Sequence, residues 1–221
     1  MFHVKHLVIL VSLFFPFICF AQGNIQLEQK EFVVSRKKDP SIVQFLSGYV
    51  SLQKLSMPEQ DTYYWVNLLR KDPPAFNDMY VAPFLEQFPS IHGASAQSLS
   101  RELKNMAPLG LVAPASIVQR EAERHALDLA QRQRRLSHES SDGRTFSQRM
   151  ADAGIKNCAG ENVFEGEDDA LKALILLLID KGVPNLGHRK ALLNPSFNVM
   201  GVSFRQSRES IYYMVQLFSC Q

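Results

Sequence analysis

The sequence predicts an α+β domain in which helices precede strands. Apolar residues recur at helical spacing in two segments, one beginning at Glu59 and the other at Ser116. Near the C-terminus, residues 199–204 and 211–218 are rich in β-branched and aromatic residues, with only polar residues between them, which is typical of an antiparallel hairpin. The periodicity by itself predicts a mixed domain, and the α+β class rests mostly on the family resemblance described below.

Length and composition indicate one compact globular domain with some additional structure. The chain has 221 residues, of which 46% are hydrophobic and 21% are charged, values that support a sizeable core and exclude a disordered chain. The net charge of +2 creates no strong field of one sign, so we expect no nucleic-acid partner. No pattern in the sequence predicts an oligomeric state.

Residues 1–21 are predicted to be a signal peptide. Lys5 precedes the apolar run 7–20, and a small residue ends the segment before Gln22. That run of about 14 residues is shorter than the ~20 needed to span a bilayer, so we expect no transmembrane anchor in the mature form. The alternative of lipid attachment at Cys19 is disfavoured by the bulky residue before it. The protein is therefore expected to be exported, to the periplasm or the extracellular space.

Two cysteines, Cys158 and Cys220, remain after removal of that segment. An exported protein occupies a compartment that permits disulfides, and an even pair favours a bridge between the two. Two separate thiols are the alternative, because a sequence does not give the Cα separation that a bridge requires.

The first part of the mature chain shows no clean periodicity. Residues 22–58 are predicted to be an N-terminal arm or linker, and the domain is expected over 59–221. Its first helix should end before Pro73, since proline lacks the backbone donor and clashes with the preceding turn. Residues 75–107 are expected to be an insertion.

The clearest helix begins at Ser116, where Gln119 completes the spacing of a capping box. His125 lies on its apolar face and is expected to be a packed, hydrogen-bonded core residue. A second capping box at Thr145 predicts a short helix that ends at Gly154, because glycine readily adopts the left-handed conformation of a helix end.

Four acidic residues within 165–169 precede the apolar run 174–179. Anions are favourable at the positive end of a helix, so this pattern predicts a buried helix with a solvated start. A calcium loop is the alternative, but the regular ligand spacing of an EF-hand is missing.

Three short motifs carry an unusual density of polar side chains. They are Ser-His followed by Ser-Ser-Asp-Gly within 137–143, Gly-Glu-Asn at 160–162, and Gly-His-Arg-Lys at 187–190 leading to Leu-Asn-Pro at 193–195. The sequence has no phosphate-binding glycine loop and no helical HExxH pair, so nucleotide and zincin chemistry are not predicted.

Together and in this order, the motifs and the terminal strand resemble the CAP superfamily of cysteine-rich secretory, antigen 5 and pathogenesis-related proteins. The resemblance covers roughly residues 59–220 and is strongest to the exported bacterial variant, in which Gly-His-Arg and Leu-Asn-Pro replace a longer eukaryotic signature. It implies an α-β-α sandwich, with a small antiparallel sheet between helical layers and a central cleft.

The resemblance also implies that two histidines and two acidic residues line that cleft. His138 matches the first histidine, Glu161 the glutamate of the Gly-Glu-Asn motif, and His188 the second histidine. The fourth position departs from the family pattern, in which a glutamate follows a tryptophan by about one turn. Here Leu177 stands in place of the tryptophan, and Asp180 follows with a shorter side chain.

These residue types permit metal binding. Neutral imidazoles can face a divalent cation while carboxylates accept the other ring N–H, so His138 and His188 are candidate zinc ligands. The alternative for the same residues is a hydrogen-bonded polar network that rigidifies the cleft. Two neighbours of the motifs have structural roles in our interpretation: Asn162 is expected to cap or turn the backbone, and Arg189 to pair with Asp180 or Glu161 rather than with an anionic ligand.

The function expected from the sequence is binding rather than catalysis. Some family members bind lipids or sterols, so the resemblance implies a small amphipathic ligand, or a cell-envelope component, in the cleft. The alternative is a hydrolase assisted by a divalent metal, in which zinc lowers the pKa of bound water towards about 7 and Glu161 acts as the base.

Overall fold

The computed structural model describes residues 30–132, 136–155 and 158–220. The predicted signal peptide over residues 1–21, the alternative lipid site at Cys19, and residues 22–29 of the predicted arm lie outside the described residues.

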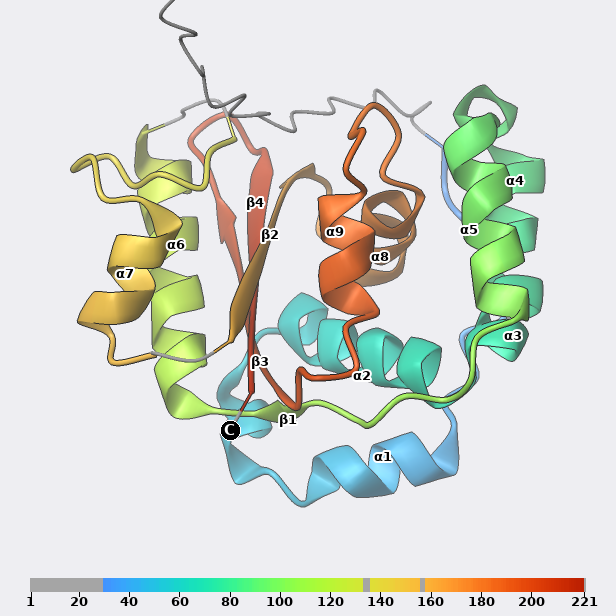
Figure 1. Cartoon of the computed structure of the whole chain (residues 1–221), viewed down its shortest axis with the longest axis horizontal. Coiled ribbons are helices and arrows are strands. Elements are labelled where there is room, and N and C mark those ends of the chain that lie inside the picture. Colours follow the sequence, from blue (N-terminus) through green and yellow to red (C-terminus); the bar gives the residue numbers. More distant parts are fainter. Residues whose placement is uncertain (1–29, 133–135, 156–157, 221) are drawn as a thin grey trace, which may run out of the picture.

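The core of the fold is a four-stranded sheet in the order β1-β3-β4-β2 (Figure 1). β4 is antiparallel to both β2 and β3, whereas the two-residue β1 is parallel to β3. The hairpin expected from 199–204 and 211–218 is confirmed as β3, which is slightly longer than predicted, and β4, which is shifted by one residue. The strands are β1 (Ala113–Pro114), β2 (Ala159–Gly166), β3 (Val199–Gln206) and β4 (Tyr212–Ser219).

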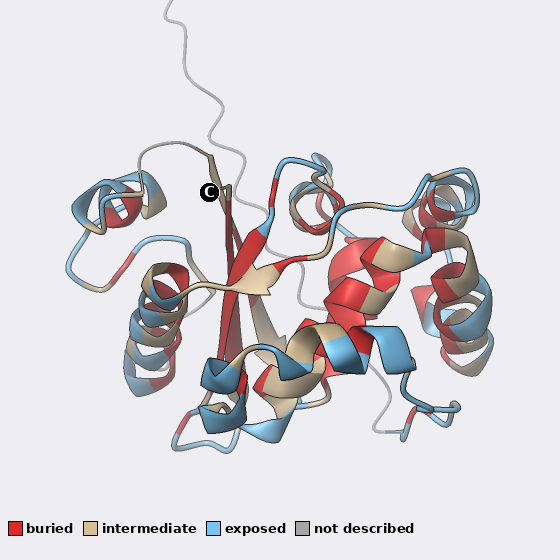
Figure 2. Ribbon diagram, turned by 90° about the horizontal axis from the view of Figure 1, so that it is seen from below, coloured by how far each residue is buried: buried red, intermediate tan, exposed pale blue. Residues whose placement is uncertain are grey.

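Helices cover both faces of the sheet, so the predicted α-β-α sandwich is confirmed. In Figure 1, α6 and α7 lie on one side of the strands, and α2, α8 and α9 lie on the other. Figure 2 shows the buried residues on the strands and on the inward sides of the helices. The helices are α1 (Pro40–Ser47), η1 (Val50–Lys54), α2 (Met57–Lys71), α3 (Pro73–Phe76), η2 (Asn77–Val81), α4 (Ala82–Gln87), η3 (Pro89–Ile91), α5 (Ala94–Lys104), α6 (Ser116–Arg132), α7 (Phe146–Asp152), α8 (Ala170–Ile179) and α9 (Gly187–Leu192).

The layer of α6 and α7 is attached to the sheet by close backbone packing. A Cβ added to Gly201 of β3 would lie 2.4 Å from the backbone carbon of Val118 and 2.5 Å from the backbone nitrogen of Gln119. The Gln119 side chain accepts from Val202 N at 3.1 Å and donates to Val202 O at 2.9 Å. α6 therefore has a fixed position on β3, and α7 begins at the predicted capping box of Thr145.

The opposite layer is built around α8, whose residues are all buried. Asp169 caps this helix by accepting from Leu171 N and Lys172 N, which agrees with the predicted acidic start of a buried helix. The burial of a helix on all sides explains why its sequence is apolar without an amphipathic period.

Arg70, at the end of α2, connects that layer to the chain after α9. Its guanidinium is fully buried and donates to the carbonyls of Gly110, Leu192, Asn194 and Phe197 at 2.7 to 3.0 Å. Burial lowers the pKa of Arg70 to about 10, so the side chain is still a cation at neutral pH. The Leu-Asn-Pro segment is thus held by the buried Arg70 guanidinium, whose hydrogen-bond partners are all backbone carbonyls.

The described part of the expected arm is packed against the domain. Residues 30–58 contain α1, η1 and the first two residues of α2, with Ile42 fully buried and Phe32 2% exposed. The Phe32 ring lies edge-on to Phe84, with centroids 5.2 Å apart. The apolar residues that anchor this segment lie far apart in the sequence, so they produce no period that would predict packing.

Two further expectations concern connections. Pro73 follows the end of α2 as predicted, and it also begins α3, because proline is tolerated in a first helical turn. The predicted disulfide is present: Cys158 and Cys220 are bonded with a Cα separation of 5.6 Å, which joins the chain before β2 to the chain after β4. Within the described ranges, no helix has the length and apolarity needed to cross a membrane.

Gly201→Ala should destabilise the protein by about 3 kcal/mol, because the new methyl group has no space between β3 and the α6 backbone. Gly110→Ala is the matched control, since a Cβ there meets nothing within 4 Å, and its effect should stay below about 1 kcal/mol. Urea unfolding monitored by circular dichroism measures both. Equal effects of the two substitutions would contradict the close packing of α6 on β3.

Candidate functional site

Glu161, the third residue of β2, accepts hydrogen bonds from two side chains of the α6 and α7 layer. Its Oε1 lies 3.0 Å from Nδ1 of His138. A single nitrogen of Arg149, Nη2, lies 2.8 Å from Oε1 and 2.7 Å from Oε2. The side chains of Glu161 and Arg149 are buried, whereas that of His138 is 45% exposed. The first pair of the site is therefore a buried carboxylate with an accessible imidazole.

Electrostatics keep the Glu161 carboxylate ionised. Burial raises the pKa of Glu161, but the hydrogen bond from His138 and the charges of His125 and Arg149 lower the pKa by more. The net pKa of Glu161 is below its ordinary value. A carboxylate is a pure acceptor, so Nδ1 of His138 must carry the proton and Nε2 keeps its lone pair when the ring is neutral.

His125 of α6 is a buried, hydrogen-bonded residue, as its position on the apolar face predicts. Its Nε2 lies 2.8 Å from the carbonyl of Ser137 and 3.9 Å from Glu161 Oε1. Because a carbonyl only accepts, Nε2 carries the proton, and Nδ1 is buried without a partner among the described residues. Burial lowers the pKa of His125, against the opposing effect of Glu161. The sequence did not indicate that this core histidine lies beside Glu161.

The second pair consists of Asp180 and His188. Asp180 ends α8 in the left-handed conformation, with φ of 55°. Its Oδ1 lies 2.7 Å from Nδ1 of His188, and its Oδ2 accepts from the backbone nitrogens of His188 and Arg189 at 3.0 and 3.3 Å. One buried carboxylate thus orients the imidazole and caps the start of α9. The His188 side chain is 12% exposed.

Asn162 lies between the two pairs. Neighbouring residues of a strand point to opposite faces, so Glu161 faces α6 and α7 while Asn162 faces the layer of α9. The Asn162 amide donates to Gln216 Oε1 at 3.1 Å, and its nitrogen is 3.5 Å from the carbonyl of His188. Asn162 therefore pairs across the sheet rather than capping or turning the backbone as expected.

Arg189 does not make the predicted ion pair with Asp180 or Glu161. Arg189 is 1% exposed, and its guanidinium donates to the carbonyls of Leu178 and Ile179 at the end of α8. Its anionic partner is Glu102 of α5, at 3.2 Å. The prediction failed because the backbone nitrogen of Arg189, and not its side chain, turns towards Asp180.

The same nitrogen is available on both imidazoles. Each donates from Nδ1 to a buried carboxylate, which leaves Nε2 as a metal or ligand atom, the arrangement that orients histidines in zinc sites. In the parts of the chain that the structure describes, no three His, Cys, Asp or Glu residues are grouped to hold a metal ion. Zinc at His138 and His188 therefore stays a prediction that needs ligands beyond these two.

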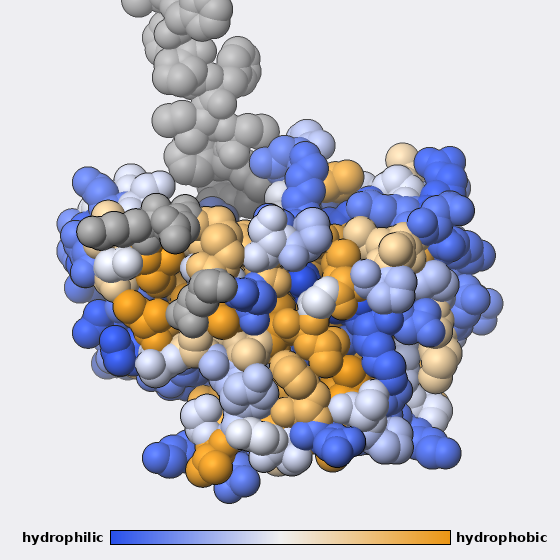
Figure 3. Space-filling view, turned by 60° about the horizontal axis from the view of Figure 1, so that its bottom comes forward, coloured by the Kyte–Doolittle hydropathy of each residue, from blue (hydrophilic) through white to orange (hydrophobic). Residues whose placement is uncertain are grey.

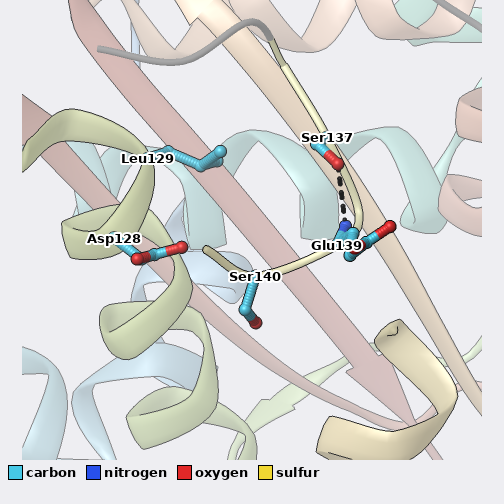
Figure 4. Close-up of a pocket in the computed structure, with 5 residues that line it drawn as sticks. All are labelled: Asp128, Leu129, Ser137, Glu139 and Ser140. Atoms are coloured by element: carbon cyan, nitrogen blue, oxygen red, sulfur yellow. Dashed lines mark hydrogen bonds between the residues drawn. The ribbon is translucent and has the colours of Figure 1, made fainter. Parts of the chain in front are cut away.

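A small polar cavity adjoins the loop that carries His138. It has a volume of about 160 Å³ and is lined by two residues of α6 and three of the loop (Figure 4). The Ser137 hydroxyl accepts from the backbone nitrogen of Glu139 across His138, so this serine stabilises the loop. The lining residues are Asp128, Leu129, Ser137, Glu139 and Ser140.

The comparison with known families decides the assignment. The sequence profile of the cysteine-rich secretory protein family (CAP) matches residues 66–220, which is more than half of the chain. The chain belongs to the CAP family. The CAP domain thus contains β2, α8, α9 and every candidate residue, and the resemblance predicted from the motifs is confirmed.

Several solved structures are similar to this CAP domain. An outer surface protein from Borrelia burgdorferi is 21% identical, with a TM-score of 0.43 over 51% of this chain and 80% of the other. An extracellular protein with an SCP domain from Bacillus anthracis is 19% identical, with a TM-score of 0.47 over 85% of this chain and 45% of the other. The CAP domain of enterococcal PrgA is 12% identical, with a TM-score of 0.41 over 85% and 80%. No sequence among curated proteins matches the chain.

Arg149 is the site residue that sequence analysis missed. It lies in the short helix α7 and reaches Glu161 from 12 positions away. No spacing rule connects a helix to the following strand across a loop, so the sequence contained no direct signal. The indirect signal was a basic residue beside Met150, on the side of α7 that is buried.

Asp180→Asn should lower the free energy of unfolding by about 2 kcal/mol, because an NH2 group replaces one of the two oxygens that accept from the ring and backbone N–H groups of His188 and from the backbone N–H of Arg189. Asparagine tolerates the left-handed conformation, so backbone strain does not add to this effect. Asp152→Asn, at an exposed ion pair with Arg144, is the control and should change stability by less than about 0.5 kcal/mol. Thermal and urea unfolding measure both. A neutral Asp180→Asn would contradict the need for two acceptor oxygens at this position.

His125 should make stability depend on pH below its ordinary pKa of 6.5. Its folded pKa lies below the ordinary 6.5, so the unfolded chain binds the proton first and stability falls as pH drops from 6.5 towards the folded pKa. The slope reaches about 1.4 kcal/mol per pH unit. His125→Gln should flatten this part of the profile, and His92→Gln, on the exposed surface, should leave it unchanged. An unaltered profile in His125→Gln would contradict the buried neutral imidazole.

Proposed function

We propose that this CAP domain is an exported binding module that holds a small amphipathic ligand, or a component of the cell envelope, at His138 and His188. The observation that carries the proposal is that the two imidazoles have the same hydrogen-bonding pattern. Each ring donates from Nδ1 to a buried carboxylate and keeps Nε2 available, so both rings are oriented before a ligand arrives. Preorganised polar atoms of this kind favour binding because little ordering is left to occur.

The surface chemistry supports an amphipathic ligand. The face in Figure 3 has apolar side chains in its middle and hydrophilic side chains around them. Ligand sites are commonly apolar surfaces with a few fixed polar groups. The proposal expects the apolar body of the ligand to lie on such a face and its hydrogen-bonding head to reach the imidazoles.

Export is supported by the disulfide. Cys158 and Cys220 form a bridge, and such bridges persist in oxidising compartments. The predicted signal peptide is consistent with the same location.

The contacts of Glu161 favour binding over the metal-assisted hydrolase. A general base needs contact with the group that it deprotonates and a pKa near the working pH. The Glu161 side chain is 1% exposed, its carboxylate accepts hydrogen bonds from Arg149 and His138, and the pKa of the carboxyl is lowered. The hydrolase alternative keeps one supporting observation, the two Nε2 atoms with carboxylates behind them.

Fluorescence titration with dansyl-labelled undecanoate tests the proposal. We expect saturable binding to the wild type and at least tenfold weaker binding to the His138→Ala/His188→Ala double variant. His92→Ala is the matched control, because His92 lines a separate groove of about 420 Å³ between α4 and α5, and its affinity should equal that of the wild type. Equal affinity of the double variant, or loss of binding in the control alone, would overturn the proposal.

Zinc titration of the same three proteins separates the two functions. Zinc binding that requires both histidines, with hydrolysis of a p-nitrophenyl ester that depends on zinc, would support the hydrolase instead. The binding proposal expects probe binding without added metal.

A further inference from the structure

We infer that Arg149 is a positioning residue, which holds the Glu161 carboxylate so that His138 is fixed in the tautomer that offers Nε2. The inference deepens the proposed function and rests on it in one respect, namely that Nε2 of His138 is the ligand atom. It follows from a juxtaposition in which one nitrogen of Arg149 contacts both the Glu161 carboxylate, which accepts from the His138 ring, and the backbone carbonyl of His138.

The geometry of that nitrogen is specific. Arg149 Nη2 lies 2.8 and 2.7 Å from the two oxygens of Glu161, and 3.2 Å from the backbone carbonyl of His138. The ring of His138 donates from Nδ1 to the same carboxylate at 3.0 Å. The guanidinium thus connects the backbone of His138 to the acceptor of its own side chain. Rotation of the carboxylate would break two of these contacts at once.

The remainder of the guanidinium has no other hydrogen-bonding role in the described structure. Nε and Nη1 of Arg149 are buried without partners among the described residues, and the nearest ring, Phe146, has its centroid 5.7 Å from Cζ. Leaving buried donors unpaired costs about 1–3 kcal/mol each. An arginine held at this cost acts through Nη2, and therefore through Glu161 and His138.

Tautomer choice is the consequence that function needs. A neutral imidazole carries its proton on one nitrogen, and the hydrogen bond of the other nitrogen selects which. His125 cannot replace Arg149, because its Nε2 is 3.9 Å from Glu161 and donates to Ser137 instead. Without Arg149 the carboxylate would have a single strong donor, His138 itself, and the orientation of the His138 ring would no longer be fixed.

The pair of Asp180 and His188 serves as an internal control. His188 is held by Asp180 through contacts that involve neither Arg149 nor α7. A loss of tautomer selection at His138 alone therefore reports positioning, whereas a loss at both histidines reports unfolding.

Imidazole ¹⁵N correlation spectra of the full chain at pH 8.5, with no ligand, measure the ratio of the Nδ1–H to the Nε2–H tautomer at each histidine. Arg149→Gln should lower this ratio at least fivefold at His138 and leave it within twofold at His188. Arg144→Gln is the matched control, since Arg144 pairs with Asp142 and Asp152 on the surface near α7. It should change neither ratio. An unchanged ratio at His138 in folded Arg149→Gln overturns the inference.

Arg149→Lys decides the case if Arg149→Gln does not fold. Lysine keeps the charge but lacks the planar fork, so the His138 ratio should fall at least twofold with the fold intact. A wild-type ratio, or failure of this variant to fold, would count against a positioning role. The tautomer measurement needs no ligand, so it is independent of the proposed function. If the Nδ1–H tautomer predominates at His138 of the wild type but the dansyl probe does not bind, only the proposed function is overturned.

Discussion

A buried carboxylate has to be surrounded by donors, and the arrangement around Glu161 satisfies that requirement. Removing an ion from water costs several kcal/mol unless partners with good geometry replace the lost hydration. Arg149 from α7, His138 from the preceding loop and the nearby His125 from α6 all converge on this one side chain of β2. The layer of α6 and α7 is thus tied to the sheet by polar contacts at Glu161 as well as by the packing of α6 on Gly201.

The pair of Asp180 and His188 depends on a different requirement, which is to supply acceptors at the start of α9. The N–H groups of a helix start need acceptors, and Asp180 supplies them while also binding the His188 ring. The short stem of this aspartate and its left-handed backbone place the carboxylate at the end of α8 itself. Arg189 joins the same region by binding carbonyls of α8. The imidazole of His188 is therefore oriented by helix ends, and that of His138 by an ion pair.

Local patterns predicted much of this, and long-range contacts accounted for the rest. The capping box at Thr145, the buried helix and the hairpin were evident because their signals lie within a few residues. In place of the capping box expected at Ser116, the Gln119 side chain bonds to Val202 of β3. His138, Glu161 and His188 could be named because they belong to short motifs. Arg149 and the side-chain partner of Arg189 could not, because nothing in the sequence specifies which residues meet across the sheet. The packing of Phe32 and Ile42 had no signal in the sequence for the same reason, since their core contacts are made with distant helices.

The disulfide constrains the two pairs of the site to different extents. Cys158 and Cys220 close a covalent loop with a sequence separation of 62, which contains Glu161, Asp180 and His188 but neither His138 nor Arg149. By the entropy of loop closure, such a link stabilises the folded state by roughly 4 kcal/mol. The strand and helices that carry one imidazole and both carboxylates are thus restrained even in the unfolded chain, while the other imidazole is held only by non-covalent contacts. The redox state of the surroundings therefore acts directly on the scaffold of the site and only indirectly on His138.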